Sequence, residues 1–329
     1  MRRCRYPETM TSGLPSRRGI LIAGAGLIGI GAAGCYTVSP IVDPGTRESP
    51  TITITPRRRA ALNTESELAA TAKRAAAAAT GSAAAMLSAV ARMHTIHAGV
   101  LAQADPLGGQ NADTEPVITP TPAPSSASTL SPLVQLVADE KRAATRYLAD
   151  AAAADTPGEA LLWASLSVFA SGFSGQGVAP VQTDAYPMTL PVETLTDARQ
   201  VLLSRLNALV AGLEWGVGRL PSSDPLHATG AARLDAVEIQ RVRLRQDLRQ
   251  ASASPTPALP GYQMPATPST PASTRELWVS LELGVLAGHG RVVAATPGPA
   301  RSTAIPAMAD QAAQLRAYGS GLPAWPGWV

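Results

Sequence analysis

Hydrophobic residues recur at every third or fourth position along most of the chain, which is the period of an amphipathic helix. In residues 65–104 the stripe includes Leu68, Val90 and Val100, and it predicts one long helix with a weak point at Gly81. The same period predicts further helices over residues 131–171, with a break near 155–158, and over 193–220, 224–251, 273–295 and 300–318.

No stretch alternates hydrophobic and polar residues for long enough to predict a β-sheet. Long helices joined by loops bury their stripes against one another, so the predicted fold class is all-α, with one or two antiparallel helical bundles. The periodicity leaves open whether the N-terminal helices form a bundle of their own. The predicted segments are a tether rich in Pro, Thr and Arg over 35–62, a helical hairpin over 63–175, a linker over 176–192 and a bundle over 193–329.

The apolar run before the tether contains Gly24, Gly26 and Gly29 in the G-x-G-x-x-G spacing of a dinucleotide-binding turn. Such a turn needs a βαβ unit, in which a crossover helix leads on to an acidic residue that binds the ribose. Asp43 stands at a tolerable distance, but Pro40 and the lack of a helical stripe argue against the crossover helix. We therefore do not expect a dinucleotide-binding fold.

The same segment has the parts of an export signal in order: a basic start, a short apolar core and a site of small residues. The stretch SRRGIL, around Arg17 and Arg18, resembles a twin-arginine export motif, and AAGC, which ends at Cys35, resembles a lipobox. The resemblance implies a signal peptide over 1–34, an acylated Cys35 and a lipid-anchored chain on the outer face of the cytoplasmic membrane. An ordinary signal peptide, in which Cys35 is incidental, is the alternative.

The net charge of the chain is different once the predicted signal is removed. Residues 1–34 hold five arginines and one glutamate, so their removal takes the formal net charge from +3 to about −1. Nucleic-acid binding depends on clustered Lys and Arg, and it loses its support. The remaining basic cluster, at residues 57–59, is interpreted as a solvated turn. With Cys4 removed and Cys35 acylated, the exported part is expected to fold without disulfides.

No catalytic machinery is evident in the sequence. The part after the signal has no free cysteine nucleophile, and the chain contains no G-x-S-x-G motif, Walker loop or C-x-x-C pair. The expectation is therefore a protein that is not an enzyme.

Residues 193–329 carry a more particular order of features. The stretch ALVAGLEWGVGRL at 208–220 is followed by the linker PGYQMPATPST, by LWVSLELGVLAGHGRVVAATPG at 277–298 and by the ending LPAWPGW. In this order they resemble an uncharacterised ferritin-like domain family found in lipoproteins of high-G+C Gram-positive bacteria. The resemblance implies a four-helix bundle of the ferritin-like type in this part of the chain.

A ferritin-like bundle implies an iron or manganese site, built from inward Glu residues and Glu-x-x-His pairs. This chain has no Glu-x-x-His, and Leu283 stands where the family usually has a second Glu. The expectation is therefore that no cofactor is bound. The alternative is an iron or manganese site formed by Glu214, Glu238, Glu282 and His289, provided that they face one cavity.

A second candidate pair is His94 and His97, which lie three residues apart on one face of the first predicted helix. Such a pair can chelate a metal ion, with Glu140 or Asp139 from a neighbouring helix completing the set of ligands. The alternative is two histidines on a polar face or at an interface, because the sequence fixes no third ligand.

The leading functional hypothesis is a lipid-anchored, non-enzymatic helical scaffold or interaction protein, held at the membrane through Cys35 and open to an envelope protein partner. A metal-binding or redox bundle is the first alternative, and a binder of a small apolar ligand is the second. Trp325 and Trp328, in the tail, either close the end of the bundle or anchor a partner, and closure of the core is the expected role.

Overall fold

The computed structural model describes residues 54–111, 115–121, 130–176, 179–181 and 183–328. The predicted signal over 1–34, with Arg17 and Arg18, and the predicted acylation site Cys35 lie outside these residues. Residues 52–329 form one compact unit, and the all-α prediction is confirmed there. Its α-helices are α1 (Pro56–Ala78), α2 (Gly81–Ala102), α3 (Pro132–Ala152), α4 (Pro157–Gln176), α5 (Leu195–Val217), α6 (Pro225–Gln250), α7 (Pro271–Ala295) and α8 (Arg301–Gln314).

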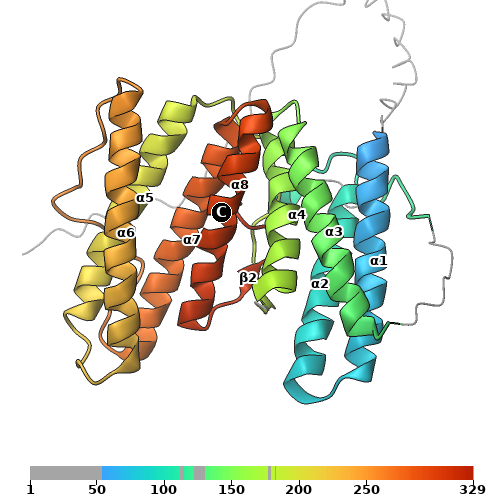
Figure 1. Cartoon of the computed structure of the whole chain (residues 1–329), viewed down its shortest axis with the longest axis horizontal. Helices are drawn as coiled ribbons and strands as arrows, with labels where there is room; N and C mark the ends of the chain where they lie inside the picture. Colours follow the sequence, from blue (N-terminus) through green and yellow to red (C-terminus); the bar gives the residue numbers. More distant parts are fainter. Residues whose placement is uncertain (1–53, 112–114, 122–129, 177–178, 182, 329) are drawn as a thin grey trace, which may run out of the picture. The chain divides into compact units, whose positions relative to one another are not determined.

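The prediction of one long helix over 65–104 is wrong, because this segment belongs to two antiparallel helices. The chain reverses at Ala79 and Thr80, and Gly81 begins α2 with φ of +61°. A residue without a Cβ adopts that left-handed conformation at little cost. The reversal packs α2 along the length of α1 (Figure 1).

Helix α1 also begins earlier than predicted, so residues 56–62 are not tether. The side chain of Thr55 caps the helix by accepting from the backbone N–H of Arg58, and Pro56 fits the first turn. Arg58 is buried and donates hydrogen bonds to the carbonyls of Leu101 and Gln103 at the end of α2. The interpretation of residues 57–59 as a solvated turn is therefore wrong for Arg58.

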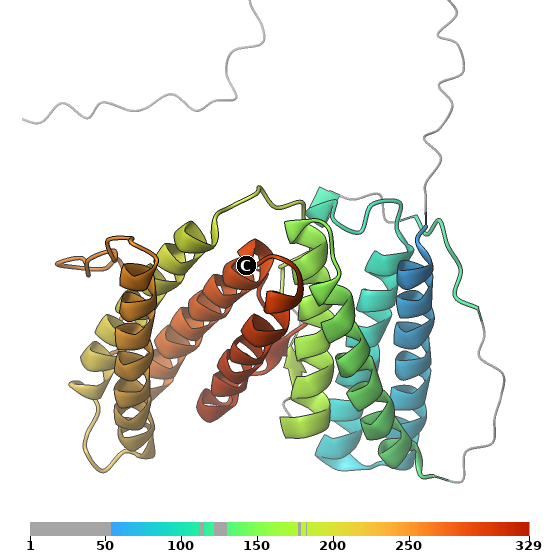
Figure 2. The same cartoon turned by 45° about the horizontal axis from the view of Figure 1, so that its top comes forward.

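Helices α1 to α4 run side by side, as Figures 1 and 2 show, with α1 packed on α2 and α3, and α3 packed on α4. The predicted break near 155–158 separates α3 from α4. The hydrophobic core of these helices continues into α7, α8 and the tail through Leu286, Met308 and Trp325. The N-terminal helices therefore share their core with the later ones.

Helices α5, α6 and α7 surround a second hydrophobic cluster. At its centre the indole of Trp278 is buried and donates a hydrogen bond to the carbonyl of Gly212, 2.9 Å away. Helix α7 also packs on α4 and α8, and so joins the two clusters. No helix in the described part of the chain is long and apolar enough to span a membrane.

The C-terminal tail runs back to the N-terminal helices. Strand β2 (Leu322–Pro323) pairs in parallel with β1 (Pro180–Val181). Beyond it, Trp325 and Trp328 are 1% and 4% exposed, which confirms that they close the core. The short elements η1 (Gly109–Asn111), η2 (Gly298–Ala300) and η3 (Leu315–Tyr318) are 3-10 helices.

Candidate metal centre

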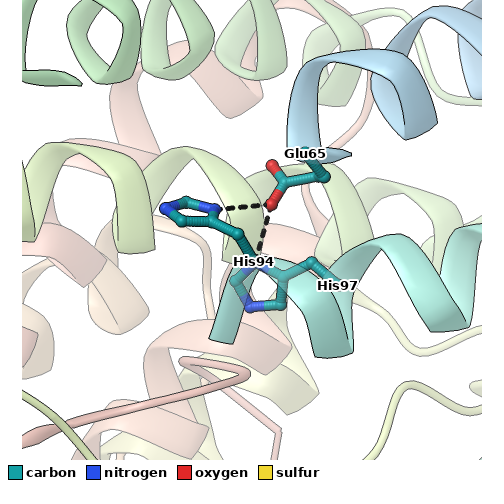
Figure 3. A group of neighbouring side chains, drawn as sticks. All are labelled: Glu65, His94 and His97. Atoms are coloured by element: carbon teal, nitrogen blue, oxygen red, sulfur yellow. Dashed lines mark hydrogen bonds and ion pairs between the residues drawn. The ribbon is translucent and has the colours of Figure 1, made fainter. Parts of the chain in front are cut away.

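The hairpin of α1 and α2 brings one carboxylate against two imidazoles. Glu65 Oε2 lies 2.8 Å from His94 Nδ1 and 3.0 Å from His97 Nδ1, and Figure 3 shows both rings turned toward this oxygen. Because His94 and His97 are three residues apart, one face of α2 presents both rings to α1. All three side chains are buried, and their facing atoms lie within 4.8 Å of one another.

The outer atoms of these side chains are held by a second set of groups. His94 Nε2 lies 2.7 Å from Oε1 of Glu140 on α3, and His97 Nε2 lies 2.7 Å from the backbone oxygen of Ala324 in the tail. The Tyr147 hydroxyl donates to Glu65 Oε1 over 2.6 Å. The orientation of each ring, and of the carboxylate, is therefore fixed from outside.

Aromatic side chains exclude water from the cluster. The ring of Phe169 on α4 meets both imidazoles edge to face, with centroids 5.5 Å from His94 and 4.7 Å from His97. The Trp325 ring lies 4.6 Å from the His97 ring on another side. In such apolar surroundings, interactions between charges are stronger than in water.

Glu65 and His94 shift each other's pKa values toward the charged forms. Burial by itself raises the pKa of Glu65, but His94 and His97 outweigh burial and hold that pKa well below its usual range. Burial opposes the charged form of His94, yet Glu140 and Glu65 raise the pKa of His94 to about 10. The favoured state of this pair is therefore a carboxylate beside an imidazolium.

Glu140 and Tyr147 behave differently from Glu65. Burial raises the pKa of the Glu140 carboxyl, although His94 opposes this, and burial together with Glu65 raises the pKa of the Tyr147 hydroxyl. Only one oxygen of Glu140 is used, because its Oε2 is buried and has no hydrogen-bond partner. A buried carboxylate oxygen without a partner is costly, so this atom has capacity for a further ligand or proton.

The contacts of the two imidazoles require more hydrogen atoms than two neutral rings carry. All four of their ring nitrogens face oxygen acceptors, namely Glu65 Oε2 (from both rings), Glu140 Oε1 and the carbonyl of Ala324. A neutral imidazole carries one N–H, so two neutral rings supply two of the four hydrogens required. The other two must come from two further protons or be replaced by a cation.

The predicted pair, His94 and His97, is thus brought together with Glu140 across the bundle. Asp139, the other acid considered, lies apart from the cluster and pairs with Arg142.

The sequence reasoning missed Glu65, because it placed this residue and the histidines on one continuous helix. The available signal was Thr80-Gly81, which marks the reversal that folds Glu65 back onto α2.

The predicted C-terminal site is not assembled, and a different arrangement surrounds its one fully buried acid. Glu282, on α7, receives both arms of the Arg233 guanidinium at 2.8 and 2.9 Å. Gln311 donates to it at 2.6 Å, and the Tyr318 hydroxyl is 3.4 Å away. These donors occupy the carboxylate that a metal ion would need.

The other three members of that prediction do not join Glu282. Glu214 is exposed on α5, and Glu238 lies toward solvent on α6, 3.6 Å from Arg241. His289 is buried beside Gln240, with 3.0 Å between their nitrogens, and burial lowers its pKa to about 4. The helix period placed each residue on a helix, but it did not show that the faces of α5 and α6 turn these two acids away from α7.

Residues 207–329 match a protein family described as a domain of unknown function (DUF4439). No curated protein and no solved structure matches the chain. The matched segment overlaps the part in which the sequence resemblance was found. It includes Ala324 and Trp325, which touch His97, whereas Glu65, His94 and His97 themselves precede it.

Proposed function

We propose that the protein binds a divalent transition-metal ion through Glu65 Oε2, His94 Nδ1 and His97 Nδ1. The main support is that four ring nitrogens face oxygen acceptors, whereas two neutral imidazoles carry only two N–H groups. A divalent cation replaces the two extra protons at the Nδ1 atoms without changing the charge of the cluster, and the two Nε2–H groups remain as donors. These reach Glu140 and Ala324 at 2.7 Å each.

The outer hydrogen bonds fit this assignment. Histidines that bind metals generally donate their other N–H to a carboxylate or a backbone carbonyl, and ligating carboxylates are themselves hydrogen-bonded. Here His94 has Glu140, His97 has the carbonyl of Ala324, and Glu65 has the Tyr147 hydroxyl. Glu140 receives His94 through Oε1 alone, and its Oε2 keeps no hydrogen-bond partner.

The donor set favours iron or manganese. Two imidazoles and one carboxylate that leave open positions are typical of non-haem iron sites, and carboxylate oxygens also suit manganese. In four-helix bundles, metal sites are built in the same way from inward Glu and His side chains of facing helices. A ferritin-like role is therefore proposed for α1 to α4, rather than for the C-terminal part to which the sequence resemblance points.

The proposed place of action is the outer face of the cytoplasmic membrane, with the chain anchored through an acylated Cys35. This rests on the sequence SRRGIL and AAGC in the N-terminal segment. Cys35→Ala, expressed in a host with the matching export machinery, is expected to move the protein from the membrane fraction to the soluble fraction. Retention of the Cys35→Ala chain in the membrane would contradict the anchor.

Metal content of the purified full chain tests the metal-binding function. After chelation and reloading with Fe(II) or Mn(II), elemental analysis is expected to find about one ion per chain, in keeping with a single cluster of ligands. Glu65→Gln and His97→Ala are each expected to abolish stoichiometric retention. His227→Ala, which changes a histidine of α6 outside the cluster, is the matched control.

Two results would overturn the proposal. One is a folded chain that retains no iron or manganese, and whose unfolding midpoint is the same in chelator and in excess metal. The other is metal retention that survives Glu65→Gln and His97→Ala. The first result would make the cluster a closed hydrogen-bonded core and leave the protein with a scaffold role.

A further inference from the structure

A cavity of about 250 Å³ lies where α4, α5, α7 and the tail meet, apart from the metal-binding cluster. Its walls are mainly apolar and include Leu161, Leu190 and Val201. Apart from Arg291, the residues that α7 contributes are small, such as Ala287 and Ala294, and they leave the space open. At about 30 Å³ per water molecule, this volume corresponds to roughly eight waters.

Three charged side chains line the same cavity, and two of them neutralise each other. Arg291 donates to both oxygens of Glu193 at 3.0 and 3.1 Å. Arg205, the third, is an exposed side chain, and in the parts of the chain that the structure describes it has no hydrogen-bond or ion-pair partner. A solvent-exposed positive charge that no protein carboxylate pairs therefore lies beside the cavity.

The side chain of Arg205 lies against α7. A Cβ built on Gly284 would lie 3.3 Å from Arg205 Nη1, so the guanidinium rests against the helix where that side chain is missing. A guanidinium that lacks a protein partner, beside a cavity with mainly apolar walls, suits a ligand that brings acceptor oxygens on an apolar body.

We propose that this cavity binds a small organic monoanion, a carboxylate with a short apolar body. The carboxylate binds the guanidinium of Arg205 in the two-pronged geometry that this side chain favours. The apolar body lies among Leu161, Leu190 and Val201. This site is independent of the metal-binding function, since none of its lining residues belongs to the Glu65, His94 and His97 cluster.

The test uses hexanoate, with hexanol and hexylamine as neutral and cationic probes of equal length. Each is titrated into the full chain and followed by calorimetry and by the NMR signals of the indole N–H groups. Hexanoate is expected to bind at least tenfold more tightly than hexanol, and hexylamine is expected not to bind. Among the indole signals, that of the lining residue Trp328 is expected to shift most.

Two variants separate the charge from the cavity. Arg205→Met is expected to weaken hexanoate at least tenfold, while leaving the weak binding of hexanol unchanged. Ala287→Leu fills the space and is expected to abolish binding of both probes. Arg199→Met, on the same helix but away from the cavity, is the matched control and is expected to bind as the unchanged chain does.

Three results would overturn the proposal for this cavity. Equal affinities for hexanoate and hexanol, or hexanoate binding that survives Arg205→Met, would overturn the proposal, as would the absence of binding in a chain that unfolds at its normal midpoint. The assay is run on chelated and on metal-loaded protein, so its outcome is separate from that of the metal analysis.

Discussion

Two buried carboxylates of this protein, Glu65 on α1 and Glu282 on α7, are equally shielded from water but differ in their partners. Glu282 is bound by the guanidinium of Arg233, which is always protonated, and by an amide from Gln311. Glu65 is bound by two imidazoles and a phenol. The difference lies in which of these partners can give up a proton.

This difference decides what each half of the molecule can do. A guanidinium cannot exchange a proton for a metal ion at neutral pH, so the pair of Arg233 and Glu282 is a structural ion pair. An imidazole nitrogen can make that exchange, and for this reason we propose the Glu65 cluster, and not Glu282, as the metal site. Burial alone does not separate these two acids, whereas the ability of their partners to lose a proton does.

The largest effect is expected from breaking the Arg233 pair. Arg233→Met leaves Glu282 buried without its cation, and this is expected to lower the free energy of unfolding by about 3–5 kcal/mol. Urea titrations measure the loss, which is expected to be the same in chelator and in manganese. As control, Arg291→Met removes the more exposed pair with Glu193 and is expected to cost less than about 1 kcal/mol.

A double variant tests whether the lost stability comes from the unpaired charge of Glu282. Arg233→Met with Glu282→Leu removes both charges and is expected to regain most of the lost stability. If Arg233→Met alone were as stable as the unchanged chain, the charge of Arg233 would not be what stabilises the buried Glu282.

The two halves are also expected to respond to pH in opposite directions. The pKa of His289 is lowered to about 4 by burial and by Arg233, so between about pH 6.5 and 4 the unfolded chain binds a proton that the folded chain does not. Stability is therefore lost as pH falls through this window, by up to about 3 kcal/mol. Urea unfolding of the unchanged chain and of His289→Gln measures this contribution as a difference.

In metal-free protein His94 is expected to show the reverse dependence. Its folded pKa of about 10 lies above the unfolded value, so the stability it contributes is fully present below about pH 6.5 and is lost as pH rises toward and past 10. Urea unfolding of the unchanged chain and of His94→Gln, compared across this pH range, measures this contribution. A His94 contribution that grows as pH rises would contradict the charge assignment of the cluster.

A smaller effect is expected from Tyr147→Phe, which removes one hydrogen bond and changes little else. The change leaves Glu65 Oε1 buried without the donor that it has at 2.6 Å. The expected cost is about 1–3 kcal/mol in metal-free protein, together with metal affinity weaker by about 10–100-fold. Competition with a chelator of known affinity measures the second quantity. Unchanged affinity would show that the hydroxyl does not orient the ligand.

Much of the fold follows from the sequence, because helix stripes, proline starts and turn residues act over a few positions. The breaks before Pro157 and Pro225 are local in this sense, and the structure has them where the sequence predicts. The hairpin at Gly81 was missed because alanine-rich stretches on both sides of it keep the helix period, which hides a two-residue reversal.

The site was less predictable, since its parts meet only through tertiary packing. The spacing of His94 and His97 identified one face of one helix, and Glu140 followed as a candidate from the neighbouring helix. Glu65 depended on the missed reversal. The carbonyl of Ala324 comes from a tail 227 residues away in sequence from His97, and no local pattern reports a contact of that kind.

The smallest effect is expected at the reversal itself. Gly81→Ala places a Cβ in open space, with no atom within 4 Å, so its cost comes only from the left-handed backbone with φ of +61°. The expected loss is about 1 kcal/mol, and metal affinity is expected to stay unchanged because α1 and α2 keep their packing. Paired with Tyr147→Phe, this variant separates a loss of stability from a loss of ligand orientation. If Gly81→Ala weakened metal binding as much as Tyr147→Phe does, the site would depend on the stability of the hairpin, and the outer hydrogen bonds would not explain its affinity.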